Sequence, residues 1–309
     1  MDVEPQTKTA PHPFDDPKAD VVFKTSDGVE VRTYNFLLSL ASPLFESMFS
    51  LPQPVEDTQK GAIDVPEDSE SFMKLLRWCD HRVSPSMDLE NLLDALVLAD
   101  KYDMACIISR VEIALTSILE DQADAEDTLS IFAIAYKLRL EDLMKFAARC
   151  TLLTPELDEF PHVKELELIP ATAMHQLSKY HSSCRKYLPD SLEDVWSDSE
   201  SPVARFRRAN KSCTACNDSD KVPKWLDRYI NTLKAYFERR IAASAAYAVA
   251  VEQKIGKEAE IKMAKCSKCK SKIQKFRKMQ KDLAEWIDDQ VYEVGTEIAF
   301  FRVKWLISY

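Results

Sequence analysis

The amino-acid sequence predicts an α+β fold, in which a small sheet with a cluster of helices precedes an all-helical C-terminal region with a long helical hairpin. Two short segments near the N-terminus alternate apolar and polar residues around a glycine turn, a pattern typical of a β-hairpin. Most of the remaining chain carries apolar residues at helical spacing. The 309 residues include only four glycines, and the abundance of Ala, Leu, Lys and Glu favours helices.

Three strands are predicted near the N-terminus. Residues 20–25 and 29–33 alternate in character and form the two arms of the hairpin, with Gly28 in its turn. A short third strand is expected at 62–65, just before a proline. Residues 1–18 are rich in Pro and Asp and show no periodicity, so a disordered tail is expected before the first strand.

The helices of this first region follow from spacing and capping residues. Residues 34–49 carry apolar side chains at helical intervals, but Pro43 divides them into two short helices. Ser42 is suited to cap the second of these helices, with Pro43 at its first position. Further helices are predicted at 69–79, 89–102 and 104–119.

The order of these elements and three short motifs resemble the BTB/POZ domain family. The family opens with Asp followed by alternating apolar residues, which here is Asp20 to Phe23 (DVVF). A family helix with the pattern Ser-x-x-Phe-x-x-Met-Phe is matched by Ser42 to Phe49, and the later Ala-Asp-x-Tyr by Ala99 to Tyr102. The resemblance covers about residues 19–120, and Tyr34 stands where many members carry His.

This resemblance implies a protein–protein interaction module that forms homodimers, with residues 20–23 and the hairpin at the dimer interface. Some members bridge substrates to cullin-type ubiquitin ligases, so a substrate adaptor is an alternative function. The segment Ser50 to Gln53 lacks the apolar-x-Glu motif of many adaptors, which ranks the adaptor below a scaffold. The whole chain is similar to BTB proteins that are numerous in fungi, with a short helical extension and late Cys-x-x-Cys pairs.

Beyond the BTB-like region the sequence predicts further helices at 124–136, 140–153 and 168–187, and a long hairpin within the last hundred residues. Residues 188–212 become acidic and Ser-rich and then basic, which predicts a linker. The chain is therefore divided into a tail at 1–18, a BTB/POZ domain at 19–120, a helical extension at 121–187, the linker at 188–212 and a last helical region at 213–309.

Charge is distributed unevenly over the chain. Residues 1–150 carry 28 acidic and 14 basic side chains, a net of −14, whereas residues 151–309 carry 23 and 27, a net of +4, which together give −10. This asymmetry favours two units with different surfaces. No signal peptide is recognisable, and the longest nearly apolar run, 241–251, is far shorter than the ~20 residues of a membrane span. A cytoplasmic or nuclear protein with reduced cysteines is expected.

Four of the eight cysteines form two Cys-x-x-Cys pairs, Cys213 with Cys216 and Cys266 with Cys269. Two intervening residues let both sulfurs of a pair approach one ion, and two pairs supply the four thiolates of a structural zinc site. The sequence therefore predicts a zinc-stapled helical region at 213–309. One objection is geometric, because a straight helix over residues 223–255 would separate the pairs by about 48 Å.

Other assignments of the cysteines stay open. His181 and Cys184 are spaced i, i+3 on a predicted helix, so Cys184 could replace one of the four thiolates. The four paired cysteines could instead be ordinary thiols without a metal. The remaining cysteines, Cys79, Cys106 and Cys150, lie on apolar faces of predicted helices and are expected in the core.

Residues 262–281 contain nine Lys or Arg and no acidic residue. This basic segment could offset the charge of a thiolate centre, lie on a solvated helix face, or contact DNA in a transcription-associated protein. Nucleic acid is an unfavoured partner because exposed aromatic residues are not interleaved with the charges. No recognised catalytic motif or phosphate-binding glycine loop occurs, so the chain is expected not to be an enzyme.

Overall fold

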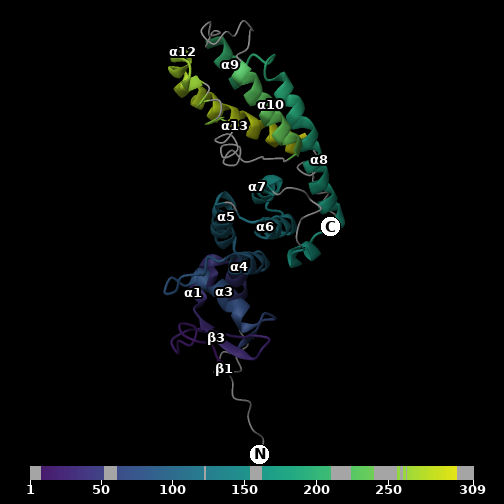
Figure 1. Ribbon diagram of the computed structural model, residues 1–309. Coiled ribbons are helices and arrows are strands. Elements are labelled where there is room, and N and C mark those ends of the chain that lie inside the picture. The colour runs from purple at the N-terminus through teal and green to yellow at the C-terminus, as the bar shows by residue number, and fades with distance from the viewer. Residues whose placement is uncertain are drawn as a thin grey trace, which may run out of the picture. The chain divides into compact units, whose positions relative to one another are not determined.

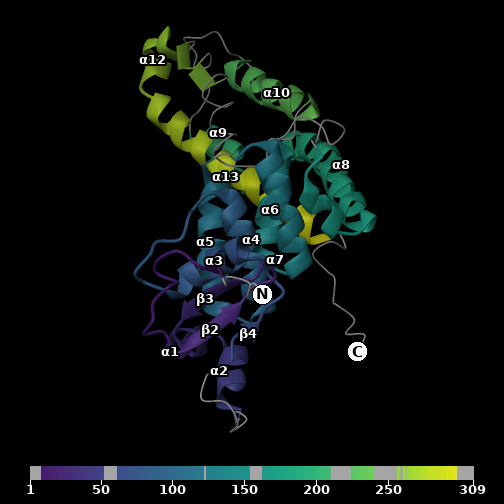
Figure 2. The same cartoon turned by 90° about the horizontal axis from the view of Figure 1, so that it is seen from below.

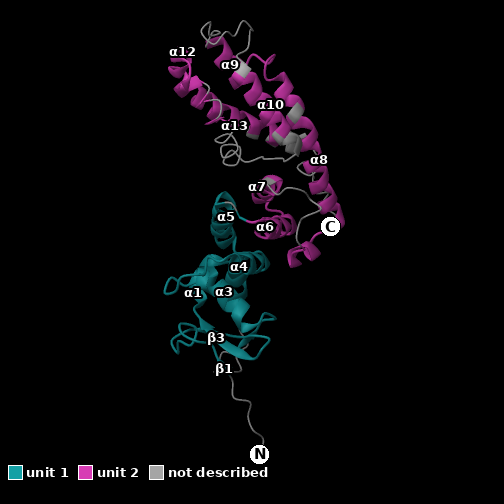
Figure 3. Ribbon diagram, viewed as in Figure 1, with its two compact units in different colours: residues 1–123 teal, residues 124–309 magenta. Residues whose placement is uncertain are grey.

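The computed structural model describes residues 8–51, 61–121, 123–153, 162–209, 224–239, 256–257, 260–261 and 263–297. The chain divides into two compact units, residues 1–123 and 124–309 (Figure 3). Each unit is described separately below. Among the described residues, no helix is long and apolar enough to cross a membrane.

Unit 1 contains a four-stranded mixed sheet with the order β1-β3-β2-β4. The hairpin predicted from the sequence is confirmed: β2 pairs antiparallel with β3 across a turn in which Gly28 adopts a φ of +77°, a conformation that glycine reaches without a steric penalty. β1 pairs parallel with β3, and β4 pairs parallel with β2. The strands are β1 (Lys8–Thr9), β2 (Val21–Lys24), β3 (Val29–Thr33) and β4 (Ile63–Asp64).

The described residues of unit 1 also form five helices, which confirm the predicted order (Figure 1). Ser42 separates the first two helices as expected, because its hydroxyl accepts a hydrogen bond from the backbone N–H of Phe45 at 3.1 Å. The same hydroxyl donates to the carbonyl of Tyr102 at 2.6 Å, which ties this break to a distant helix end. The helices are α1 (Asn35–Ala41), α2 (Pro43–Ser50), α3 (Ser69–Cys79), α4 (Leu89–Lys101) and α5 (Ala105–Glu120).

An aromatic core holds the sheet against these helices. The ring of Phe23 on β2 contacts Phe45 on α2 and Phe72 on α3, with centroids 5.8 and 5.0 Å apart. Tyr102 stacks on Phe45 at 5.1 Å and reaches Phe72 at 6.0 Å. All four side chains are buried, so motif residues of the opening strand, the second helix and the helix end meet in one cluster.

The prediction of a disordered tail is wrong for residues 8–18. This segment adds β1 to the edge of the sheet, and Ala10 and Phe14 are buried against unit 1. The backbone of Phe14 also accepts a hydrogen bond from the N–H of Arg32 at 2.8 Å. One buried ring and one short edge strand are enough to order a Pro-rich segment that has no periodicity of its own. Residues 1–7 lie outside the described residues.

Unit 2 is helical throughout its described part (Figure 2). The paired helices predicted after residue 120 are confirmed, with Asp124 capping the first of them by accepting from the N–H of Asp127 at 2.9 Å. The elements are α6 (Ala125–Leu138), α7 (Glu141–Cys150), η1 (Thr151–Leu153), η3 (Lys164–Leu168), α8 (Ala171–Asp194), α9 (Pro202–Ala209), α10 (Lys224–Arg239), α12 (Ser267–Lys270) and α13 (Ile273–Glu297).

A buried histidine connects α8 to the end of α7. His181 is 4% exposed, and its Nε2 lies 2.8 Å from the hydroxyl oxygen of Thr151. Because Thr151 donates its own hydrogen to the carbonyl of Ala148 at 2.6 Å, His181 is the donor in the first contact. Burial lowers the pKa of His181 to about 4, so the ring is neutral at pH 7.

The predicted linker at 188–212 is wrong for residues 188–209. α8 continues to Asp194, and its last turns bury Leu188 and Leu192. A turn then leads into α9, where Ser201 caps the helix by accepting from the N–H of Ala204 at 3.0 Å, and Phe206 is buried. The many Asp, Ser and Arg residues occupy the exposed sides of these helices and conceal a short apolar stripe.

Phe276 is the centre of the second half of unit 2. This side chain of α13 is fully buried and contacts one aromatic ring on α9 and two on α10. The ring centroids lie 6.1 Å from Phe206, 5.2 Å from Trp225 and 5.3 Å from Tyr229. The beginning of α10 therefore packs beside the beginning of α13, with α9 against both (Figure 1).

The second helix of the predicted long hairpin is confirmed as α13, which has 25 residues. The first helix of this hairpin is described from Lys224 to Arg239, and the predicted continuation to residue 251 lies outside the described residues. Gly256 is helical instead of a left-handed cap, and a Cβ built on it would lie 1.9 Å from the side chain of Gln280. Gly256 thus lies against α13, where Glu260 also pairs with Arg277 at 2.7 Å.

Truncation of Phe276 tests the aromatic cluster. Phe276→Ala should lower the free energy of unfolding by about 3 kcal/mol or more, because it leaves a cavity among three rings. Lys270→Glu, an exposed change in the same region, should cost less than about 0.5 kcal/mol. Urea unfolding followed by tryptophan fluorescence measures both. Equal small effects would show that α13 does not pack through this face.

The buried His181 predicts a specific pH response. Its pKa is about 6.5 in the unfolded chain and about 4 in the folded one, so only the unfolded chain binds a proton between these values. Stability is therefore lost as the pH falls, by about 2 kcal/mol between pH 7.5 and 5. His181→Gln keeps a donor for Thr151 and should remove that loss, whereas His175→Gln, at an exposed position of α8, should keep it. Parallel urea titrations at both pH values decide, and an unchanged pH response in His181→Gln would contradict the assignment.

Candidate functional site

The most exposed large apolar side chains of unit 1 lie on two helices that pack against each other. On α1, Phe36 is 73% exposed and Leu40 is 76% exposed, and their i, i+4 spacing puts them on one face. On α5, Ile113 is 72% exposed. α1 and α5 are in contact, with the thiol of Cys106 lying 3.9 Å from the carbonyl of Ala41. Together these residues form an apolar surface of the kind that marks an interaction site.

The rest of α1 fixes the direction of this apolar surface. Leu38 is fully buried and anchors the opposite side of the helix. The carboxylate of Asp20 accepts a hydrogen bond from the first helical N–H, that of Asn35, at 2.7 Å. At the other end, Ser42 is bonded to Tyr102 as described above. Phe36 and Leu40 are thus held outward by contacts at both ends of a seven-residue helix.

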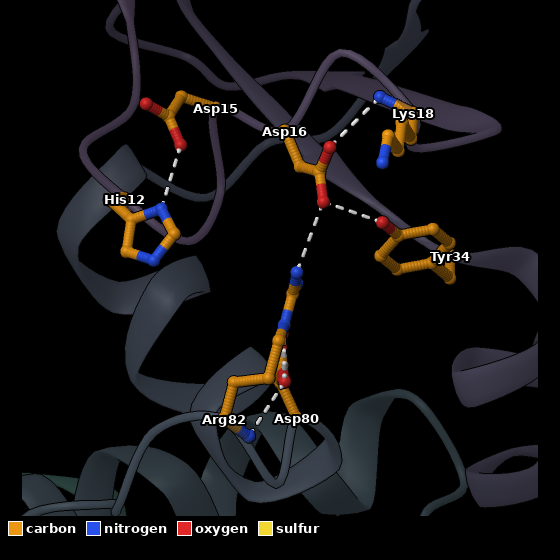
Figure 4. A network of polar contacts seen from close by, with 7 residues as sticks. All are labelled: His12, Asp15, Asp16, Lys18, Tyr34, Asp80 and Arg82. Carbon is orange, nitrogen blue, oxygen red and sulfur yellow. Dashed lines mark hydrogen bonds and ion pairs between the residues drawn. The ribbon is translucent and has the colours of Figure 1, made fainter.

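Tyr34, directly before α1, belongs to a polar network that holds the N-terminal segment in place (Figure 4). Its hydroxyl donates to Asp16 at 2.6 Å, and Arg82 donates to the same carboxylate oxygen at 3.1 Å. Arg82 also binds Asp80, which is 2% exposed, at 2.6 Å. These bonds, first that from Tyr34, lower the pKa of Asp16, while Asp16 raises the pKa of Tyr34. Tyr34 therefore has a structural role, because its hydroxyl group binds the segment around Asp16.

Residues 20–23 and the hairpin, which the resemblance places at a dimer interface, include strands β2 and β3 of the sheet. β2 is an inner strand, paired on both edges by β3 and β4. Its Val21 and Phe23 are buried in the core of the same unit. The alternating apolar residues of β2 therefore belong to the core of unit 1, whereas the exposed apolar surface lies on α1 and α5.

In unit 2, Cys266 and Cys269 occupy the two ends of a tight turn. Cys266 precedes α12 with extended backbone angles, φ −110° and ψ 122°, and its carbonyl accepts hydrogen bonds from the N–H groups of Cys269 and Lys270 at 3.1 and 2.9 Å. Cys269 is buried and Cys266 is partly exposed. A turn of this kind brings both sulfurs of a Cys-x-x-Cys pair toward one side, as metal binding requires.

The packing of unit 2 also bears on the other Cys-x-x-Cys pair. Trp225 follows Cys216 by nine residues, and Phe276 follows Cys269 by seven. Their rings are 5.2 Å apart, so the chain positions that follow the two pairs meet at one place. Nine residues span at most about 30 Å, so Cys216 lies within that distance of Trp225. The geometric objection from a straight helix therefore does not apply to the described part of the chain.

Cys213 and Cys216 themselves lie outside the described residues. Within the described part, no group of three or more His, Cys, Asp or Glu side chains is arranged to hold a metal ion. The six cysteines of that part form no disulfide. Of the three expected in the core, Cys150 is buried and Cys79 is partly exposed, but Cys106 is exposed, which corrects the prediction for that residue.

The structure places the alternative ligands, His181 and Cys184, away from the turn that holds Cys266 and Cys269. The hydroxyl of Tyr187, one turn beyond Cys184, donates to Gln290 at 3.2 Å. Residue 290 is about 26 Å along α13 from its start. The later residue Phe206, on α9, contacts Phe276 near that start, so the chain from α8 to α9 runs antiparallel to α13. His181 and Cys184 thus lie far from the turn at Cys266. Burial also raises the pKa of the Cys184 thiol to about 12, which disfavours the thiolate.

The apolar surface of α1 was not identified as a site by the sequence reasoning, although a signal was present. Residues 36–38 and Leu40 are apolar in a seven-residue helix, so apolar side chains surround its axis. Such a helix in a small unit has more apolar surface than one core can cover. The segment examined for a ligase contact, Ser50 to Gln53, is described only as far as Leu51.

A comparison with protein families agrees with the fold of unit 1. The sequence model of the BTB/POZ domain family matches residues 15–119. This range includes strands β2 to β4 and helices α1 to α4. No curated protein matches the chain. Domains of this family are typically non-catalytic modules for protein interaction. The match, the order of the elements and the aromatic core lead to one assignment: residues 15–119 are a BTB/POZ domain.

Proposed function

We propose that the protein is a non-enzymatic interaction scaffold that dimerises through its BTB/POZ domain and carries a structural zinc ion in its helical C-terminal region. The observation that carries the first part is the apolar surface of α1. Phe36 and Leu40 are each more than 70% exposed although the helix is held at both ends. Leaving two large apolar side chains in water is unfavourable, by about 1.5–3 kcal/mol each relative to burial.

A second copy of the chain is the partner that fits this surface. In a symmetric dimer the same patch serves both subunits, so an apolar helix face without charged residues is self-complementary. α1 carries no acidic and no basic residue in its seven positions, NFLLSLA. A face of this composition offers no charge that repels its own copy.

The zinc proposal rests on the turn at Cys266 and on the packing of Trp225 against Phe276. The turn presents one thiol pair, and the packing brings the segment after the other pair to the same region. The surrounding lysines favour thiolates and offset the charge of a four-thiolate centre. The ligands proposed are Cys213, Cys216, Cys266 and Cys269.

The dimer is tested by light scattering on the full chain at micromolar concentration. The wild-type protein should show about twice the chain mass of 35.3 kDa. Phe36→Ser combined with Leu40→Ser should raise the dissociation constant at least tenfold, because both subunits lose apolar contact area. Met87→Ser, at another exposed apolar position of unit 1, is the matched control and should leave the dimer intact. A wild-type monomer at 100 µM would refute dimerisation, and a dimeric double variant would refute this interface.

Metal analysis of the purified chain tests the zinc site. About one zinc per chain is expected, and Cys213→Ser or Cys266→Ser should each abolish binding, because a zinc ion held by two pairs does not survive the loss of a ligand. Cys184→Ser and Cys106→Ser should retain the metal, since neither residue lies in the proposed set. Unit 1 should stay folded in all four variants. Protein from a zinc-replete preparation that holds no metal and exposes all four thiols to a labelling reagent would exclude the site.

A further inference from the structure

The outward side of α12 and the first half of α13 is covered by lysines. Phe276, Met279 and Leu283 form the buried stripe of α13. On the side away from this stripe, and on α12 before it, lie five exposed lysines, which we call the lysine face: Lys268, Lys270, Lys275, Lys278 and Lys281. No acidic residue interrupts the sequence between residues 262 and 281, so the face carries one sign of charge.

Most of these lysines have no acidic partner in the part of the chain that the structure describes. Within the described residues, Lys268, Lys270, Lys275 and Lys278 form no ion pair, and Lys281 has only a long contact of 3.9 Å to Glu285. Some lysines elsewhere in the chain are paired, for example Lys74 with Asp94 at 2.9 Å. Among the described residues, no carboxylate therefore neutralises the charge of Lys268, Lys270, Lys275 or Lys278.

Helix stability does not explain these charges. The N-terminal end of a helix carries partial positive charge, so lysines there cost about 0.3–1 kcal/mol each. α13 begins with Lys275, Arg277 and Lys278 in its first two turns and has no acidic residue in its first turn. Its acidic residues begin only at Asp282, and Glu297 stands at the C-terminal end, where a negative charge is also unfavourable. The distribution opposes the helix dipole and suits a negatively charged partner instead.

We propose that the lysine face binds the phosphodiester backbone of a double-stranded nucleic acid. No large apolar side chain is among the exposed residues of the described stretch 263–281. A protein interface needs apolar anchors at its centre, and single-strand binding uses exposed aromatic rings. A row of lysines without either matches the uniform charge of a duplex backbone, where contacts are made without base recognition.

The dimensions of the face set the number of contacts. From Lys268 to Lys281 the chain advances about 20 Å along the helices at 1.5 Å per residue. A duplex carries one negative charge per about 1.7 Å of its axis, so every lysine of the face has a phosphate within reach. Four or five contacts correspond to a slope of about −4 in a plot of log affinity against log salt concentration.

α9 adds to the same positive potential. This helix has three arginines and no acidic residue, and Phe206 packs it against Phe276 of α13. Arg205 and Arg208 are exposed there. The first half of the chain carries a net charge of −14 and the second half one of +4, so binding is confined to this part of unit 2 and weakens steeply as salt is raised.

Fluorescence anisotropy of the full chain with a labelled DNA duplex of about 20 base pairs, from 50 to 200 mM salt, tests the proposal. The wild-type protein should bind with the slope given above. The triple variant Lys275→Gln, Lys278→Gln, Lys281→Gln should bind at least tenfold more weakly at 50 mM salt, with a slope smaller by about 2–3. The matched control, Lys24→Gln, Lys179→Gln, Lys186→Gln, also removes three exposed lysines and should behave as wild type.

Further arms identify the partner. An RNA duplex of the same length should bind with a similar slope, because the backbone alone is read. Vesicles containing phosphatidylserine provide the alternative polyanion, which deserves a test because Ile261, just before the segment, is 58% exposed. Binding to vesicles without binding to either duplex overturns the proposal. So does an unchanged salt slope in the lysine-face variant, provided that its circular dichroism matches wild type. Neither outcome bears on dimerisation or on zinc, which have separate readouts.

Discussion

The packing of Phe276 among Phe206, Trp225 and Tyr229 is the contact on which the second unit depends. It joins three helices that are separated by up to 70 positions in the sequence, from 206 to 276. Because the ring is fully buried, it also fixes the rotation of α13 about its axis. That rotation sends the lysines outward, and the same contact brings Trp225, nine residues after Cys216, against Phe276, seven residues after Cys269. The exposure of the lysine face and the proposed zinc site thus both depend on the packing of Phe276.

Much of unit 1 follows from its sequence because local and tertiary signals agree there. The helix at 69–79 has an apolar stripe and a capping Asp68 whose carboxylate accepts from the N–H of Ser71 at 2.9 Å. The break at Pro43 was equally readable. In unit 2 the sequence pattern does not predict the end of α8 or any of α9, because these segments have few apolar residues, such as Leu192 and Phe206, among many charged ones. Tertiary packing orders such segments, and composition does not report it.

The candidate sites were less predictable than the fold, for two physical reasons. A periodic apolar pattern says that a side chain avoids water, but it does not say whether the same chain covers it. Phe23 and Phe36 look alike in sequence, yet one is fully buried and the other is 73% exposed. Spacing within a cysteine pair indicates a ligand turn, whereas the meeting of distant pairs depends on helix packing that only coordinates reveal. His181 and Cys184 illustrate this limit, because their helical spacing was suitable and their location was not.

α8 has a consequence for how unit 2 comes apart. Its first half is bonded to the end of α7 through His181, and its second half contacts α10 and α13, where Glu193 pairs with Lys234 and Tyr187 bonds to Gln290. Pro189 lies inside this helix, so one backbone hydrogen bond is missing from its ladder. This weak point lies in the second half of α8, between Tyr187 and Glu193, the two residues that contact α13 and α10. Amide protection should fall locally near that proline, and cooperative unfolding of the two halves is coupled through a single helical segment.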